Sequence, residues 1–243
     1  MVDKYELYDS GGLETLYHVS DSIVAFPTWN YAEKVKGENI ARLRDFGLGF
    51  YTCKDDYDYS LKIASGKDIM VLNKYNVHLS GLKCIELAIN LEWLLVVAFH
   101  RRDFMSHGRR WLLSLRDRCR DWVRGCDLVI GPISDDRTYS VVEMYVDNLI
   151  TDETAIKMLN VTNYGYQYVF KSELACSRLT NGFSGSSTYE LGEIIKIREE
   201  FFKEKVDFGE TVDKIRVDRI QGGEGLTFTN LLESGEFDAR VRF

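Results

Sequence analysis

Five short stretches of the chain alternate apolar and polar residues or carry a brief run of β-branched and aromatic residues. Such patterns predict β-strands, because successive side chains of a strand point to opposite faces of its sheet. The stretches are ETLYHVS (14–20), GLGFYTC (47–53), IMVLNKYNV (69–77), CDLVIGPI (126–133) and YGYQYVFKS (164–172). The last of them alternates most strongly, and the fourth ends in a Gly-Pro turn.

Apolar residues recur with the helical period in the segments between and after these strands. The clearest case is residues 108–125, where Leu112, Leu115, Cys119 and Trp122 share one face. Further helices are predicted over residues 55–68, 84–102, 139–149, 151–160, 172–179 and 189–206. In the helix over 151–160, Thr151 is the expected N-cap.

The order of the elements predicts an α+β fold. Helices cluster between strands rather than alternating with them regularly, which argues against a doubly wound sheet. Residues 180–188, TNGFSGSST, have the composition of a linker. We therefore expect one domain over residues 1–180 and a largely helical C-terminal extension over 181–243, of unassigned role.

Composition describes an ordinary soluble protein. The formal net charge of −7 and the pI of about 5.3 disfavour whole-surface binding to nucleic acid or to an anionic membrane. Arg116, Arg120 and Arg124 form a stripe that could contact an acidic target, but interleaved aspartates favour a solvated helix face. The N-terminus lacks a secretory signal and the longest apolar run is too short to cross a bilayer, so a cytoplasmic location is expected.

Common catalytic and metal-binding motifs are missing. The five cysteines are scattered and the four histidines have no paired spacing, so reduced thiols and no metal site are expected. The sequence carries no P-loop, GxSxG or HExxH. The DFG at residues 45–47 has no accompanying Gly-rich loop and HRD, which excludes a protein kinase. The GLG at 47–49 enters a strand, the wrong order for a dinucleotide-binding turn.

Three pieces remain, LYHVS, DFGLGFYTC and YGYQYVFKS, and each alone has an ordinary packing interpretation. In this order they resemble the ADP-ribosyltransferase fold of the His-Tyr-Glu type, and more closely a bacterial family of uncharacterised domains in that superfamily. NLEWLLVVAFHR, CDLVIGPISDDRTY and YQYVFKSELACSRL add to the resemblance, which covers about residues 14–180. It implies a split β-sheet with surrounding helices and NAD bound in a cleft of that sheet.

The resemblance assigns roles to individual residues. His18 would hold the nicotinamide ribose, Tyr51 would stack on the nicotinamide, and Gly49 would let the ligand approach the strand. Gln167 occupies the third position, where relatives carry Glu. Arg101 would pair with the NAD diphosphate, or else be a basic residue favoured at a helix C-terminus.

Gln167 is a departure with chemical consequences. An amide hydrogen-bonds a hydroxyl but is neither a general base nor a negative charge beside an oxocarbenium ion. Asp135, Asp136 and Glu173 are candidates for a supporting carboxylate, with a turn and helix cap as the equal alternative for the Asp pair.

The expected activity is transfer of ADP-ribose from NAD to a macromolecular acceptor, protein or nucleic acid, with release of nicotinamide. An NAD glycohydrolase and a catalytically inactive binding module on the same fold are the alternatives. By analogy with toxin or phage-conflict effectors, a small neutralising antitoxin or immunity protein is an expected partner, and no membrane is.

Overall fold

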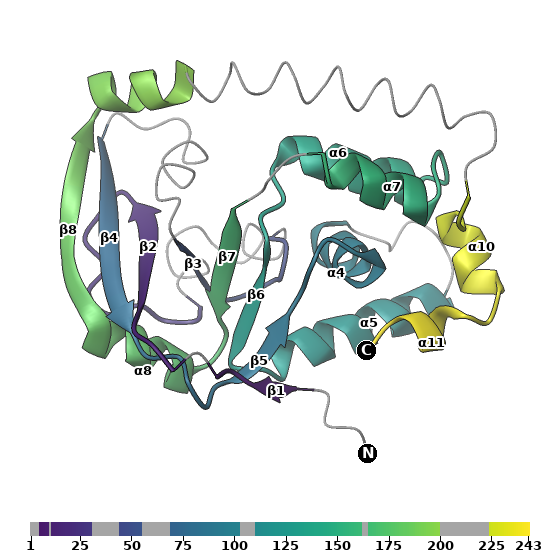
Figure 1. Cartoon of the computed structure of the whole chain (residues 1–243), viewed down its shortest axis with the longest axis horizontal. Helices are drawn as coiled ribbons and strands as arrows, with labels where there is room; N and C mark the ends of the chain where they lie inside the picture. The colour runs from purple at the N-terminus through teal and green to yellow at the C-terminus, as the bar shows by residue number, and fades with distance from the viewer. Residues whose placement is uncertain are drawn as a thin grey trace.

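The computed structural model describes residues 5–9, 11–30, 44–54, 69–102, 110–161, 165–199 and 224–243. It confirms the predicted α+β class, with one mostly antiparallel sheet of eight strands and helices around it (Figure 1). The sheet order is β1-β5-β6-β7-β3-β2-β4-β8. The strands are β1 (Glu6–Leu7), β2 (Glu14–Ser20), β3 (Phe50–Lys54), β4 (Ile69–Val77), β5 (Lys83–Glu86), β6 (Leu128–Pro132), β7 (Tyr166–Phe170) and β8 (Phe183–Glu190). Only the β5–β6 pair among them is parallel.

The two faces of the sheet carry separate hydrophobic cores. On β7, Val169 belongs to the larger core, whereas its neighbours Tyr168 and Phe170 belong to the smaller one, as the period of a strand requires. The larger core is formed with α4 (Leu91–Arg101), α5 (Arg110–Arg124), α6 (Asp136–Val146), α7 (Asp152–Leu159), α10 (Phe228–Glu233) and α11 (Phe237–Arg240). The smaller core is covered by α8 (Glu173–Gly182). Figure 1 shows the first group gathered beside β5 and β6, away from β8.

Helix capping follows the sequence closely. Thr151 accepts a hydrogen bond from the backbone N–H of Thr154 and caps α7 as predicted. Asn90 does the same for α4 through the N–H of Trp93. The predicted helix over 84–102 therefore begins too early, because its first residues form β5 instead. A run of apolar residues that short does not distinguish a strand from the start of a buried helix.

The predicted linker over residues 180–188 is wrong. These residues complete α8 and enter β8, which pairs with β4 from Ile69↔Glu190 to Tyr75↔Phe183 at the edge of the sheet. The predicted helix over 189–206 begins too early, because residues 189 and 190 end β8, and its described remainder, residues 191–199, is helical. The predicted helix over 55–68 lies outside the described residues.

The C-terminal segment, residues 224–243, packs against the rest of the protein. Phe228, Phe237 and Phe243 enter the larger core. Arg242 forms an ion pair of 2.6 Å with the buried carboxylate of Glu92 on α4. The described part of the extension beyond β8 is mainly helical, as expected. None of the helices in the described ranges has the length and apolarity needed to cross a membrane.

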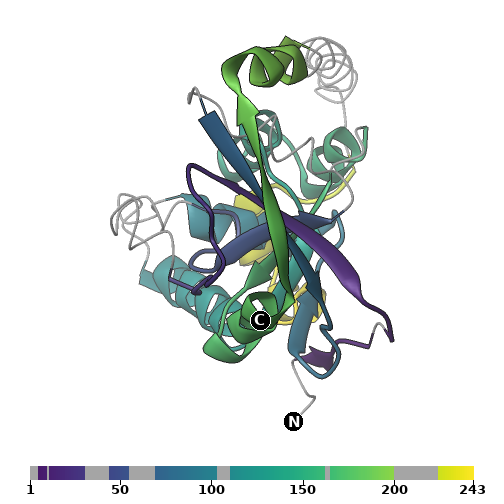
Figure 2. The same ribbon diagram turned by 90° about the vertical axis from the view of Figure 1, so that its left-hand side faces the viewer.

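Over the described residues, one strand junction in the middle of the sheet has fewer pairs than its neighbours. β2 pairs with β4 along its full length, from Glu14↔Val77 to Ser20↔Val71. Between β2 and β3 the described residues form two pairs, Leu16↔Lys54 and Tyr17↔Cys53, and Lys54 is the last residue described in this stretch. Beyond Tyr17 the two strands diverge, and β2 runs steeply across the sheet in the side view (Figure 2). We call this junction the β2–β3 seam.

Candidate functional site

The three residues singled out by the sequence lie on three adjacent strands. His18 is on β2, Tyr51 on β3 and Gln167 on β7, and these strands neighbour one another in the order β7-β3-β2. Cys53 of β3 lies directly opposite both Tyr17 and Gln167, which fixes the register across the three strands. Residues 149 positions apart in the chain, from 18 to 167, thus lie on neighbouring strands of the sheet. Their side chains do not all share one face: His18 packs against Phe50 of the smaller core, whereas Tyr51 and Gln167 alternate with Phe50 and Tyr168 and face the larger core.

His18 lies where the β2–β3 seam opens. Its Nδ1 is 2.7 Å from the backbone carbonyl oxygen of Tyr51. A carbonyl only accepts, so Nδ1 carries the proton in this contact. The half-buried imidazole also packs against the ring of Phe50, with centroids 4.3 Å apart. The side chain of His18 therefore links β2 to β3 at the point where their backbone pairing ends.

Tyr51 is anchored by the loop that precedes its own strand. Its hydroxyl donates to the carbonyl of Gly47 at 2.7 Å and accepts from the N–H of Phe46 at 3.2 Å. Burial raises the pKa of the Tyr51 hydroxyl, which keeps it protonated as the donor. The guanidinium of Arg44 lies 4.8 Å from the ring centroid of Tyr51, in a cation–π contact.

The glycines of this loop are required by close packing. Gly47 has a φ of 70°, and a Cβ there would meet Cδ2 of His100 at 2.8 Å. A Cβ on Gly49 would clash with Cγ1 of Val169. Gly49 thus has a packing role against β7, and its predicted role toward a ligand stays a prediction.

The two phenylalanines beside these glycines pack in the cores on opposite sides of the sheet. Phe46 belongs to the larger core and Phe50 to the smaller one. The loop therefore crosses from one face of the sheet to the other immediately before β3.

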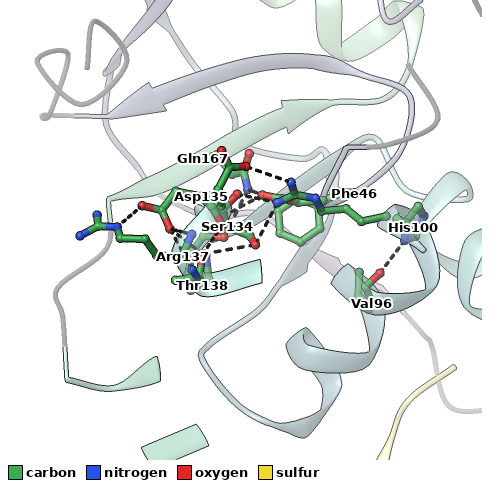
Figure 3. Close-up of polar contacts among 12 residues, drawn as sticks. Phe46, Val96, His100, Ser134, Asp135, Arg137, Thr138 and Gln167 are labelled. Atoms are coloured by element: carbon green, nitrogen blue, oxygen red, sulfur yellow. Dashed lines mark hydrogen bonds and ion pairs between the residues drawn. The ribbon is translucent and has the colours of Figure 1, made fainter. Parts of the chain in front are cut away.

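Gln167 is buried and its amide is held by two acceptors. Nε2 donates to Oδ2 of Asp45 at 2.7 Å and to the carbonyl of Pro132 at 3.2 Å. Both partners accept only, so the amide nitrogen has to face them. Figure 3 shows Gln167 next to Ser134, which lies between the end of β6 at Pro132 and the start of α6.

Asp45 is the carboxylate of this site, and the sequence patterns did not identify it. It is buried, and Oδ2 also accepts from the backbone N–H of Ser134 at 2.9 Å. Arg101 lies 3.4 Å from Oδ1. Burial raises the pKa of Asp45, while Arg101, Gln167 and Ser134 act in the opposite direction. The sequence offers one indication of its role: an acidic residue stands just before the glycine-containing segment 47–49 that leads into β3.

Arg101 is engaged within the protein. Its guanidinium donates to the carbonyl of Ser134 at 3.0 Å, lies 4.0 Å from the ring centroid of Tyr139, and is 3.6 Å from the exposed carboxylate of Asp136. Arg101 is the last residue of α4. This position fits both interpretations from the sequence, a contact to the NAD diphosphate and a basic residue favoured at a helix C-terminus. The contact to the NAD diphosphate stays a prediction.

The other candidate carboxylates have structural surroundings. Asp135 caps α6, accepting from the N–H groups of Arg137 and Thr138, as the helix-cap alternative expected (Figure 3). Glu173 is exposed in the first turn of α8, beyond the far end of β7 from Gln167. Of the three supporting candidates, Asp136 alone contacts Arg101.

The arginine stripe of α5 is largely satisfied within the protein. Arg116 pairs with Asp117, Arg124 with Asp121, and Arg120 donates to the carbonyl of Phe99. These contacts favour a solvated, ion-paired helix face over a nucleic-acid surface.

The side chains of Lys171 and His100 support the loop before β3 from the other side. Lys171 donates to the carbonyl of Phe46 at 2.5 Å, and burial lowers the pKa of Lys171 to about 8. His100 shares a 2.8 Å contact with the carbonyl of Val96, and burial lowers the pKa of His100 to about 3. Figure 3 places His100 and Val96 apart from Gln167, on α4. All five cysteines are buried and none forms a disulfide.

Comparisons with known proteins give one family and no named relative. The searches of curated proteins and of solved structures found no match. A family model matches residues 15–181, a range that contains His18, Asp45, Tyr51, Arg101 and Gln167 and ends close to the predicted boundary at 180. Since this match spans more than half of the chain, the protein belongs to the family described as "Protein of unknown function (DUF3990)".

Proposed function

We propose that this protein transfers ADP-ribose from NAD to a macromolecular acceptor and releases nicotinamide. One observation supports the proposal: His18, Tyr51 and Gln167, chosen by resemblance, lie on three adjacent strands, and the imidazole of His18 contacts the backbone carbonyl of Tyr51. The assignment as an ADP-ribosyltransferase rests on this adjacency together with the sequence resemblance.

The reaction makes demands that this arrangement can meet. The bond from the ribose anomeric carbon to the nicotinamide nitrogen breaks, and its electron pair leaves with nicotinamide. The acceptor's nucleophilic atom then bonds to the same carbon and loses its proton. Positive charge builds on the ribose between these events, so rigid placement and nearby negative charge lower the barrier.

Each predicted residue has a role consistent with its position. The half-buried imidazole of His18 stands at the opening of the seam. Its Nε2 is covered in this structure and would have to be uncovered to contact the ribose. The ring of Tyr51 would stack on nicotinamide after Arg44 has moved from its face. Gln167 would accept a hydrogen bond from a ribose hydroxyl through Oε1, because Nε2 is already committed.

The experiment is incubation of the purified protein with NAD, alone and with protein or nucleic-acid acceptors, with nicotinamide release as the readout. Release that depends on an acceptor supports transfer. Release in water alone identifies an NAD glycohydrolase instead. No release with any acceptor, and no NAD binding by calorimetry, would leave a binding module and overturn the proposal.

Variants locate the site within the same assay. His18→Ala and Tyr51→Ala should each lower nicotinamide release at least about 100-fold, the scale of losing a positioning contact at the reacting centre. His78→Ala is the matched control, because His78 is an exposed histidine just beyond β4. Full activity of both site variants, at unchanged thermal stability, would place the site elsewhere.

A further inference from the structure

The amide of Gln167 is held in one orientation by groups that are themselves fixed. The carbonyl of Pro132 also accepts from Nε1 of the buried Trp93 at 3.1 Å. Oδ2 of Asp45 also accepts from the N–H of Ser134. Because these acceptors are tied to the backbone at the end of β6, turning the amide of Gln167 would place its oxygen against two other oxygens.

Asp45 is held from its second oxygen as well. Arg101 lies 3.4 Å from Oδ1 and is itself fixed by the carbonyl of Ser134 and by the ring of Tyr139. The carboxylate is buried and contacts Gln167, Ser134 and Arg101, so a rotation would break several contacts together. The surroundings of position 167 are thus complementary to an amide and unfavourable to a carboxylate.

We propose that Asp45 is the positioning residue of the site, which fixes the Gln167 amide so that Oε1 is presented to a ribose hydroxyl of NAD. This inference rests on the proposed function. The position that carries Glu in the resembling proteins is neutral here, and the negative charge stands one hydrogen bond away, on Asp45. The two side chains therefore act as a unit that supplies both the acceptor and the charge.

A thermal unfolding comparison tests the unit without any ligand. Gln167→Glu should lower Tm by about 4 °C or more in the wild-type background, because it sets a carboxylate against Asp45 and against a carbonyl. In the Asp45→Asn background the same change should lower Tm by less than half as much. Should Gln167→Glu not fold, Gln167→Met replaces it, since it removes the donor without adding charge.

Asp136→Asn is the matched control background. Asp136 contacts the same guanidinium of Arg101 but is exposed, and no contact joins it to Gln167 among the described residues. Gln167→Glu should be as costly there as in wild type. Equal costs of Gln167→Glu in the wild-type and Asp45→Asn backgrounds would overturn the pairing.

Kinetics of nicotinamide release test the positioning role. Asp45→Asn should lower kcat about 10-fold or more and change KM less than about 3-fold, because the negative charge that it removes matters most when positive charge develops on the ribose. Adding Gln167→Glu to Asp45→Asn should recover part of kcat, since a carboxylate returns to the site. Wild-type kcat in Asp45→Asn would overturn the role. A wild-type protein that releases no nicotinamide refutes the proposed function, whereas the unfolding comparison still decides the pairing.

Discussion

Two buried aspartates in this protein each lie beside an arginine, yet they serve different ends. Asp152, the first residue of α7, accepts from Arg240 at 2.6 Å through Oδ2. Its Oδ1 accepts from the backbone N–H groups of Glu153 and Leu226 at 2.9 and 2.8 Å. The contacts with Arg240 and Leu226 tie the C-terminal segment to the helical layer, whereas the contact with Glu153 lies within α7. The N-terminal end of a helix also favours a negative charge.

Asp45 is compensated much less directly. Its arginine is 3.4 Å away, and its shortest contact, of 2.7 Å, is to the neutral amide of Gln167. Burial correspondingly raises the pKa of Asp45. Asp152 has a close arginine and two backbone donors, which suit a carboxylate that stabilises the fold. Asp45 has a more distant arginine, one backbone donor and a neutral amide, so more of its charge is left for a ligand to use.

Removing the charge at Asp152 should have the largest effect on stability. We expect Asp152→Asn to lower the free energy of unfolding by about 3 kcal/mol, because it leaves Arg240 without its partner and disturbs two backbone contacts. Urea unfolding measures this loss. Asp147→Asn is the control, since Asp147 pairs with Arg102 at the surface and should cost less than about 1 kcal/mol. Equal losses would remove the distinction between buried and exposed pairs.

Acid should lower the stability of the fold through the titration of His100 and not through that of Asp45. A raised folded pKa means that folded Asp45 binds its proton before the unfolded chain does, so acid does not destabilise the fold there. His100 has the opposite sign, because its pKa is lowered to about 3 in the fold from 6.5. As pH falls below 6.5, only the unfolded chain takes up this proton, so stability is lost, with a limiting slope of about 1.4 kcal/mol per pH unit.

The measurement is urea unfolding between pH 7 and pH 4. His100→Gln should flatten the stability profile in this window, because the titrating group is gone. His78→Gln changes an exposed histidine and should leave the slope as in wild type. A steep profile that survives His100→Gln would point to other groups.

Asp45→Asn should cost little stability, about 1 kcal/mol or less. The asparagine oxygen can still accept from Ser134 and Gln167, and the desolvation cost of a buried charge disappears. Denaturant unfolding beside Asp152→Asn is the direct check. A loss as large as that of Asp152→Asn would make Asp45 another structural anchor.

The smallest effect is expected at Arg44. Its guanidinium covers a face of the Tyr51 ring and adds to the positive charge around Asp45. Arg44→Ala removes a cation–π contact worth about 0.5–1 kcal/mol, so NAD should bind about 2- to 5-fold more tightly. Calorimetric titration with NAD measures this, and weaker binding would show that Arg44 contacts the ligand rather than competing with it.

Local patterns predicted most of the secondary structure. Alternation in residues 164–172 predicted the stretch that contains β7, and the cap at Thr151 located the start of α7. β8 was missed because its sequence, FSGSSTYE, is polar and glycine-containing, and pairing with β4 alone makes it a strand. Tertiary context overrode a composition typical of a linker.

The candidate site was predictable only in part. His18, Tyr51 and Gln167 were found by resemblance, because the blocks that contain them occur in a recognisable order. The bond from Gln167 to Asp45 joins residues 122 positions apart, and no spacing rule connects such partners. Only the structure, in which β3 pairs with β7, shows that the carboxylate of Asp45 lies beside Gln167.

The β2–β3 seam also has a mechanical consequence. Among the described residues, β2 and β3 are joined by two backbone pairs, by the contact of His18 with the carbonyl of Tyr51 and by an ion pair of 2.7 Å between Lys54 and Glu14. Over the same residues, β2 and β4 share seven backbone pairs. Within this part of the sheet, side chains therefore carry a larger share of the load when β2 is pulled from β3 than when β2 is pulled from β4.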